Sequence, residues 1–199
     1  MQTPSITDCY KLIFEMEMMD HIVAHSLQVC RVALFLTDRL KEKGISLNKN
    51  LVQASALLHD ITKTRSLKTG ENHAQTGGHI LNEQGYPEVG HIIGQHVFLE
   101  TYSVTDPPGE PEIVNYSDKR VLHDKIVSLK ERMDYIMERY GKGPEHQERI
   151  RLLGREAGKL ENKLFRWLPF SPGELGELVG HDCSASFSEY RDVCIQNSN

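Results

Sequence analysis

Apolar residues recur every three or four positions through most of the chain, and this spacing predicts a protein built of helices. The first such segment spans about residues 20–43 and is followed by Gly44, a common stop signal. The second begins after Asn48, a good capping residue, and is apolar on most sides, so we expect this helix inside the protein. The same pattern predicts helices over about 71–84 and 87–97.

The longest helix is expected in the second half of the chain. Apolar positions between about residues 112 and 140 share one helical face, and a charged surface helix is predicted over about 145–167. Two polar stretches, 62–72 and the proline-rich 103–112, are expected to be irregular, and the residues after about 167 should form a weak tail. Because no segment alternates apolar and polar residues over a convincing length, the predicted fold class is all-α.

The composition suits a single domain. The 199 residues are interpreted as a motif-bearing core over about 20–140 and a C-terminal helical extension over about 141–199. A net charge of -5 lacks the basic excess of a non-specific nucleic-acid binder, so the expected partner is a small molecule. No apolar run approaches the roughly 18 residues of a membrane span. The first residues also lack the basic leader of a signal peptide, so the predicted location is the cytoplasm.

Several histidines and aspartates occupy positions of the predicted helices that should face the core. An unpaired polar group there costs several kcal/mol, so each of them needs a partner. A single buried histidine is more often a hydrogen-bonded core residue than a metal ligand. One or two ions of Fe, Mn, Co, Ni or Zn, however, would satisfy the whole set at once. The set consists of His25, His73, His96 and Asp118, together with the adjacent pair His59 and Asp60.

Five short segments that contain these residues follow one another in order: HSLQVCRVA, ALLHDITK, HAQTGGHIL, IIGQHV and YSDKRV. This ordered set, over about residues 20–122, resembles the HD superfamily of metal-dependent phosphohydrolases, whereas an HD dipeptide alone would carry no weight. The resemblance implies an HD-domain helical bundle. It also implies a first metal ion bound by His25, His59, Asp60 and Asp118, and a second ion that shares Asp60 and is bound by His73 and His96.

The activity that this resemblance implies is hydrolysis of a phosphoester or phosphoanhydride in a small, nucleotide-like substrate by a metal-activated water. Asp60 would serve in catalysis because it touches both ions. Lys63 occupies the lysine position of the family pattern HDxxK and would neutralise a substrate phosphate, although a solvated loop residue explains it equally well. Arg65 and the pair Lys119 and Arg120 are interpreted as solvated residues.

Two other functions remain open at this point. Some HD-fold proteins that use a di-iron centre for oxygenation show the same order of ligands and also carry HDxxK. A non-catalytic module that binds a metal or a nucleotide is the third hypothesis, and the complete ligand set weighs against it because a binding site could lose ligands freely. The remaining histidines are expected at the surface, at the rim of the site or outside the motif region: His21, His79, His91, His123, His146 and His181.

Overall fold

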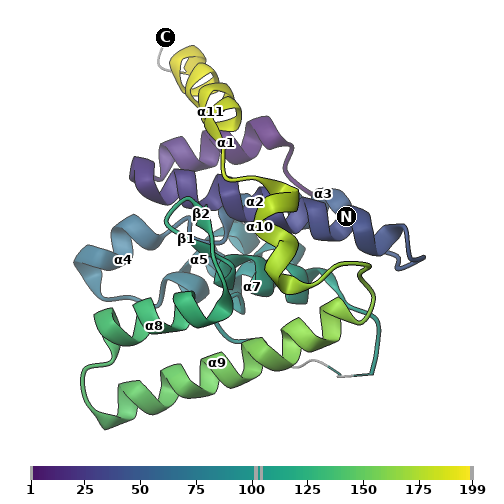
Figure 1. Cartoon of the computed structure of the whole chain (residues 1–199). Helices are drawn as coiled ribbons and strands as arrows, with labels where there is room; N and C mark the ends of the chain where they lie inside the picture. Colours follow the sequence, from purple (N-terminus) through teal and green to yellow (C-terminus); the bar gives the residue numbers. More distant parts are fainter. Residues whose placement is uncertain (1, 101–102, 104, 198–199) are drawn as a thin grey trace.

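The computed structural model describes residues 2–100, 103 and 105–197, and these residues form a helical bundle (Figure 1). The one sheet among them is a two-stranded antiparallel hairpin, so the all-α fold class is confirmed. No helix in the described part of the chain has both the length and the apolar character that crossing a membrane requires. The helices are α1 (Ile6–Glu15), α2 (Asp20–Lys41), α3 (Lys49–Leu58), α4 (Lys63–Thr69), α5 (His73–Glu83), α6 (Pro87–Gly94), α7 (Glu110–Lys119), α8 (Leu129–Tyr140), α9 (Pro144–Phe165), α10 (Leu175–Val179) and α11 (Ser184–Asn197).

The centre of the bundle is the long helix α2, which packs against α3 and α7. Its stripe of Val29, Ala33 and Leu36 is completely buried, as the helical spacing predicts. Helix α3 is buried on nearly all sides, and it begins where the side chain of Asn48 accepts a hydrogen bond from the backbone N–H of Leu51 (3.2 Å). Both helices therefore follow their predicted course.

Helices α5 and α6 pack as a close pair because small residues line their contact. A Cβ atom on Gly78 would lie 2.8 Å from the carbonyl oxygen of Gly90, and one on Gly90 would lie 2.6 Å from that of Gly78. Any larger residue at either position would push the two backbones apart. This contact matters for the site, since His73 begins α5 and His96 follows the end of α6.

The predicted single helix over residues 112–140 is wrong. Helix α7 ends at Lys119, and the chain then forms the hairpin of β1 (Val121–Leu122) and β2 (Lys125–Ile126) before α8 begins. The turn is reached through a left-handed backbone conformation at His123 (φ 56°). Ser128 then caps α8 and exchanges hydrogen bonds with Glu131, a capping box that marks a new helix start in the sequence. The chain therefore doubles back after α7.

Other segments expected to be irregular or weak are also helical. The polar stretch 62–72 contains α4, which ends at Gly70 in the left-handed conformation. The tail contains the 3₁₀ turn η1 (Pro172–Glu174), α10 and α11, and helix α1 precedes the core. These short helices are held by packing that the local pattern does not reveal, such as the edge-to-face contact between Tyr10 of α1 and Tyr190 of α11.

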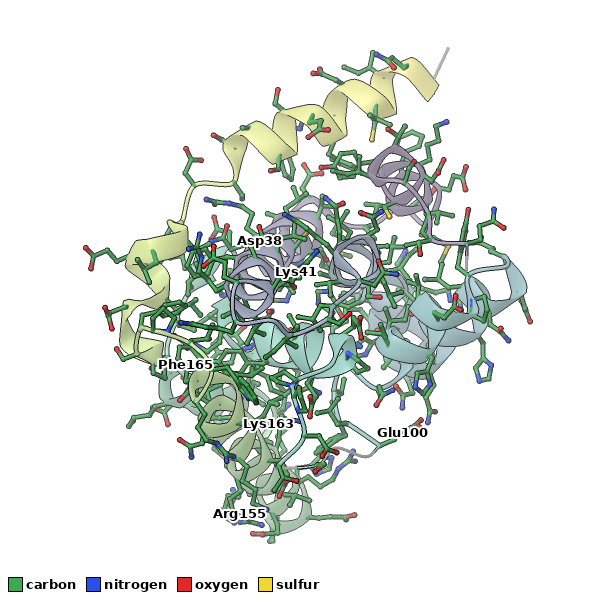
Figure 2. All side chains as sticks on the ribbon, turned by 90° about the vertical axis from the view of Figure 1, so that its right-hand side faces the viewer. Asp38, Lys41, Glu100, Arg155, Lys163 and Phe165 are labelled. Carbon is green, nitrogen blue, oxygen red and sulfur yellow. The ribbon has the colours of Figure 1, made fainter. Side chains whose placement is uncertain are left out.

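The C-terminal helices form an extension that is fastened to the core by buried charged groups. Lys163 of α9, labelled in Figure 2, donates a hydrogen bond to the carboxylate of Glu112 in α7 at 2.6 Å, and both side chains are almost fully buried. Arg120 is bound to Glu161 of α9 at 3.2 Å. Helix α11 lies along the outside of the bundle, against α1. The predicted helical extension is thus present.

Candidate metal centre

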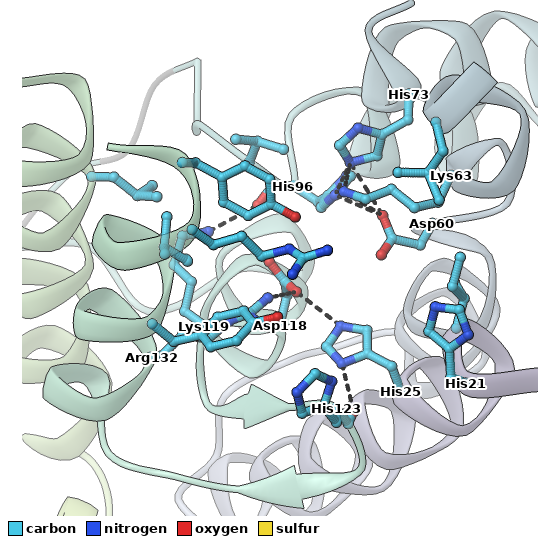
Figure 3. Close-up of a pocket in the computed structure, with 18 residues that line it drawn as sticks. His21, His25, Asp60, Lys63, His73, His96, Asp118, Lys119, His123 and Arg132 are labelled. Carbon is cyan, nitrogen blue, oxygen red and sulfur yellow. Dashed lines mark hydrogen bonds and ion pairs between the residues drawn. The ribbon is translucent and has the colours of Figure 1, made fainter. Parts of the chain in front are cut away.

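The fold brings the six predicted ligands together: five of them line the floor of one cavity of about 470 Å³ (Figure 3), and the fully buried His59 lies directly behind them. They arrive from five separate segments, and all lie within a helix or within two residues of its end. Helix α2 supplies His25, the end of α3 is followed by His59 and Asp60, α5 begins with His73, α6 is followed by His96, and α7 supplies Asp118.

Three of the imidazole rings are oriented by backbone carbonyl groups. The Nδ1 atom of His25 lies 2.9 Å from the carbonyl oxygen of His123, that of His59 lies 2.8 Å from Ala56 O, and that of His96 lies 2.7 Å from Ile93 O. A carbonyl oxygen can only accept, so Nδ1 must carry the proton in each pair. This arrangement fixes the ring and turns Nε2 toward the site, as is usual for metal-ligating histidines.

His59 and His96 are neutral at physiological pH. Burial lowers the pKa of His59, and burial together with the nearby His59 ring lowers the pKa of His96 to about 3. Since Nδ1 donates in both rings, Nε2 presents a bare lone pair. In the described part of the chain, the buried Nε2 atom of His59 has no hydrogen-bond partner. A buried acceptor of this kind is costly unless a ligand satisfies it.

The two carboxylates around these nitrogens are ionised. Burial raises the pKa of Asp60, but the charge of Lys63 and the hydrogen bond with His73 outweigh it and hold that pKa well below the usual value. Burial likewise opposes ionisation of Asp118, yet the hydrogen bond from His25 and the charge of Arg132 hold its pKa well below the usual value. The site therefore keeps two negative charges close to the neutral imidazoles of His59 and His96.

The Nε2 lone pairs of His59 and His96 lie close to carboxylate oxygens in this cluster. His59 Nε2 lies 3.6 Å from Asp60 Oδ2 and 3.8 Å from Asp118 Oδ1, and His96 Nε2 lies 3.6 Å from Asp60 Oδ1. Two acceptors repel each other unless a cation or a proton lies between them. Two groups of atoms are spaced to hold an ion, namely His25, His59 and Asp118, and His59, Asp60 and His96. The donor set thus fits divalent transition-metal ions.

His73 adjoins the second group. Its Nε2 atom lies 3.1 Å from Asp60 Oδ1 and 3.3 Å from His96 Nε2. Lys63 approaches the same point, with Nζ 3.3 Å from His73 Nε2 and 3.8 Å from Asp60 Oδ1. The HDxxK lysine therefore faces the cluster, whereas Arg65 pairs with Glu71 at 2.6 Å on the exposed surface, away from the cavity lining.

Two cationic residues that the sequence did not single out as site residues lie at the other end of the cluster. Arg132 of α8 is 3.6 Å from Asp118 Oδ1. Lys119, interpreted as solvated, is buried instead, and its ammonium donates to the carbonyl oxygens of His96 (3.0 Å) and Asn115 (3.2 Å). Burial lowers the pKa of Lys119 to about 8. The solvated interpretation is also wrong for Arg120, which is buried because the chain bends after α7.

The other histidines lie where the sequence places them. His21 and His123 are exposed and line the rim of the cavity. The remaining four are exposed residues outside the cavity lining: His79, His91, His146 and His181. His123 also has a role that its side chain could not reveal, because its backbone carbonyl orients His25.

Fold and cluster together define a member of the HD superfamily. The profile of the HD domain matches residues 22–136, which is more than half of the chain, and the chain belongs to this family. HD domains bind divalent metal ions, and the superfamily includes metal-dependent phosphohydrolases.

Several curated proteins are similar in sequence. An uncharacterized protein of Methanocaldococcus jannaschii is 29% identical over 154 residues, which cover 71% of this chain and 90% of the relative. A tRNA (cytidine(56)-2'-O)-methyltransferase of Picrophilus torridus is 27% identical, and its counterpart in Thermoplasma volcanium is 28% identical. Both alignments cover 66% of this chain but only 40% of the methyltransferase. No solved structure gives a significant match.

Proposed function

We propose that this protein is a metal-dependent hydrolase of a small phosphoester or phosphoanhydride, with nucleotide-like compounds as the expected substrates. The observation that carries this proposal is the convergence of neutral Nε2 atoms and ionised carboxylates on points that need a cation, in a cavity that is also lined by cationic side chains. The first feature suits divalent metal ions, and the second suits an anionic substrate.

Each residue of the cluster has a distinct part in this proposal. His25, His59, Asp60 and Asp118 would hold the first ion, and Asp60, His73 and His96 would hold the second. Bound ions would polarise a phosphoryl oxygen and supply a hydroxide near neutral pH. The backbone carbonyls at His123, Ala56 and Ile93 keep the imidazoles in the ligating tautomer and orientation.

Lys63 is proposed to bind the phosphate of the substrate. Its ammonium points at Asp60 and His73, where it would weaken ion binding by repulsion unless an anion lay between. A substrate phosphoryl group supplies that anion. Lys63 would hold it through a charge-assisted hydrogen bond and orient it toward the ligand cluster.

A nucleotide-like substrate is supported by the character of the cavity and by the relatives. Tyr135 and Tyr140 line the cavity and offer aromatic faces against which a base could stack. Two relatives carry names that describe an activity on tRNA. A small phosphorylated compound remains the proposed partner, because the cavity of about 470 Å³ has the size of a small-molecule site.

The experiment that tests this function combines a metal assay with a substrate screen. Protein purified without added metal is analysed for its elements, and phosphate release is then measured over nucleotides, cyclic nucleotides and simple phosphoesters. The proposal expects metal-dependent phosphate release that persists without oxygen. Oxygen consumption by an iron-loaded sample, with no phosphate release under anaerobic conditions, would favour the oxygenase instead.

A further inference from the structure

The inner face of α8 lines the cavity, and its contacts with the rest of the protein there are few: Tyr135 meets the ring of His123 edge-to-face, and Arg132 approaches Asp118. Arg132, Tyr135, Ile136 and Arg139 occur at the spacing i, i+3, i+4 and i+7, which places them on one side of the helix, and all four line the cavity. None of the twelve residues of α8, all of which the structure describes, is buried. A helix face of this kind, polar and aromatic and turned toward a cavity, is available for a ligand.

Arg132 is the residue on this face whose own contacts are least complete. Its side chain is 17% exposed, and its ion pair with Asp118 Oδ1 is 3.6 Å long, beyond hydrogen-bond distance. Its Nε atom is buried and has no hydrogen-bond partner among the described residues. A guanidinium has five donors in a fork that matches phosphate geometry. A buried donor without an acceptor is costly, so the Nε side of the fork needs an acceptor in addition to the distant Asp118 carboxylate.

Lys119 lies near this fork, and one of its three donors has no acceptor among the described residues. Its ammonium carries three protons, and the backbone carbonyls of His96 and Asn115 accept two of them. Lys119 also lines the cavity, so the third proton is available to a ligand bound there. Together, Arg132 and Lys119 form a cationic pair next to Asp118.

The cluster therefore has cationic groups at two ends. Figure 3 shows Lys63 beside Asp60 and His73, and Arg132 with Lys119 beside Asp118. The two carboxylates face three cationic side chains even before any metal ion is counted. A substrate with one phosphoryl group would satisfy the Lys63 end and leave the buried Nε donor of Arg132 without an acceptor.

We propose that Arg132 and Lys119 form a second phosphoryl-binding site at the Asp118 end, so that the substrates of this site are phosphoanhydrides with at least two consecutive phosphoryl groups. This inference rests on the proposed function and narrows its substrate class. Arg132 holds the additional phosphoryl group in place and sets specificity. It takes no part in activating water.

The test measures binding rather than turnover, so that it does not depend on hydrolysis. Protein loaded with the metal that it retains on purification is titrated calorimetrically with inorganic phosphate and with methylenediphosphonate. The second probe has two phosphoryl groups joined by an unhydrolysable CH₂ bridge. Because diphosphonates chelate metals, the metal content is measured before and after each titration. The variants are Arg132→Met, which removes the charge, and Arg132→Lys, which keeps it. The matched control is Lys130→Met on the solvent side of α8, where the lysine is 84% exposed.

The wild type should bind methylenediphosphonate at least about 10-fold more tightly than phosphate, since it engages both cationic ends. Arg132→Met should bind methylenediphosphonate about 10- to 100-fold more weakly than the wild type, because it lacks one charge-assisted contact. Its affinity for inorganic phosphate should fall by less than about 3-fold. The diphosphonate affinity of Arg132→Lys should lie between those of the wild type and Arg132→Met. Lys130→Met should bind both probes as the wild type does.

Three results would overturn the inference: equal binding of both probes by the wild type, an equal effect of Arg132→Met on both, or loss of metal in Arg132→Met. The last result would show that Arg132 only positions Asp118. A different measurement tests the proposed hydrolase function itself. A substrate screen without phosphate release would remove the hydrolase proposal while the difference between the two probes stood. Hydrolysis of monophosphates as efficient as that of phosphoanhydrides would remove this inference alone.

Discussion

The ligand cluster at the floor of the cavity and the inner face of α8 are held in place in different ways. His59 and His96 are almost fully buried, and backbone carbonyls fix their rings. Helix α8 buries none of its residues, packs mainly on α9, and presents Arg132 with its Nε atom unsatisfied. One region is preorganised for a metal, and the other is open to a ligand.

This difference separates chemistry from recognition. A rigid cluster loses little entropy when it binds an ion, which favours tight and geometrically defined coordination. A helix with few contacts can adjust to the molecule that fills the cavity. We therefore expect substitutions at the floor to abolish metal binding and activity, and substitutions on α8 to change which anions bind.

The largest effect is expected for Asp60→Ala. This carboxylate contributes an oxygen to the second group and lies 3.6 Å from His59 Nε2, so its removal should cost most of the metal and reduce phosphate release by at least about 1000-fold. The assay is the initial rate on the best substrate of the screen. Asp38→Ala is the control, because Asp38 lies on the exposed side of α2 and pairs with Lys49. Normal turnover by Asp60→Ala would refute its catalytic role.

The sequence predicted the ligand cluster far better than it predicted the role of α8. His25 and Asp118 stood out because polar residues on apolar helical faces need partners, and the order of motifs tied them to His59 and Asp60. Arg132 could not be placed in this way. In the expected straight helix it would lie about 21 Å along the axis from Asp118, fourteen residues at 1.5 Å each. The hairpin after α7 returns the chain and leaves the two side chains 3.6 Å apart.

The next largest effect is expected for Lys63→Met, which keeps much of the side-chain length and removes the charge. Metal content should stay at the wild-type level, because Lys63 is proposed to touch the substrate and not the ion. The value of kcat/KM should fall about 10- to 1000-fold, the loss of one charge-assisted contact. Phosphate should also inhibit the variant less than the wild type. Unaltered turnover together with unaltered phosphate inhibition would make Lys63 a solvated residue only.

His73→Ala and His96→Ala test whether the floor holds two ions. Each should lower the metal content toward one ion per chain, because the first group of His25, His59 and Asp118 stays intact. His79→Ala is the matched control on α5, where the side chain is exposed. Elemental analysis of the purified variants gives the stoichiometry. If both variants kept full metal content and full activity, a binuclear site would be excluded.

The smallest effect is expected in the stability of the metal-free protein. The pKa of His96 is about 3 in the folded protein against 6.5 in an unfolded chain, so the unfolded state binds more protons between these values. The free energy of unfolding should therefore fall as the pH drops below about 6.5. At pH 5.5 this one group should account for about 1 kcal/mol.

Urea unfolding of EDTA-treated protein at pH 7.5, 6.5 and 5.5 measures this slope. The lowered pKa values of Asp60 and Asp118 affect the free energy of unfolding only at more acidic pH, because both carboxylates are ionised in the folded and the unfolded protein above about pH 5. His96→Gln should give a flatter pH dependence than the wild type. An equally steep dependence in the variant would show that His96 does not titrate as its burial requires.

The most direct test of the metal centre is the metal content of protein purified without added metal and then incubated with Fe, Mn, Co, Ni or Zn. The wild type should hold one or two tightly bound ions per chain, and His59→Ala should lose the first ion, because the buried Nε2 atom of His59 has no hydrogen-bond partner among the described residues and would be a ligand of that ion. His79→Ala should equal the wild type. A wild-type protein that binds none of these ions, or a His59→Ala variant with normal metal content, would contradict the account.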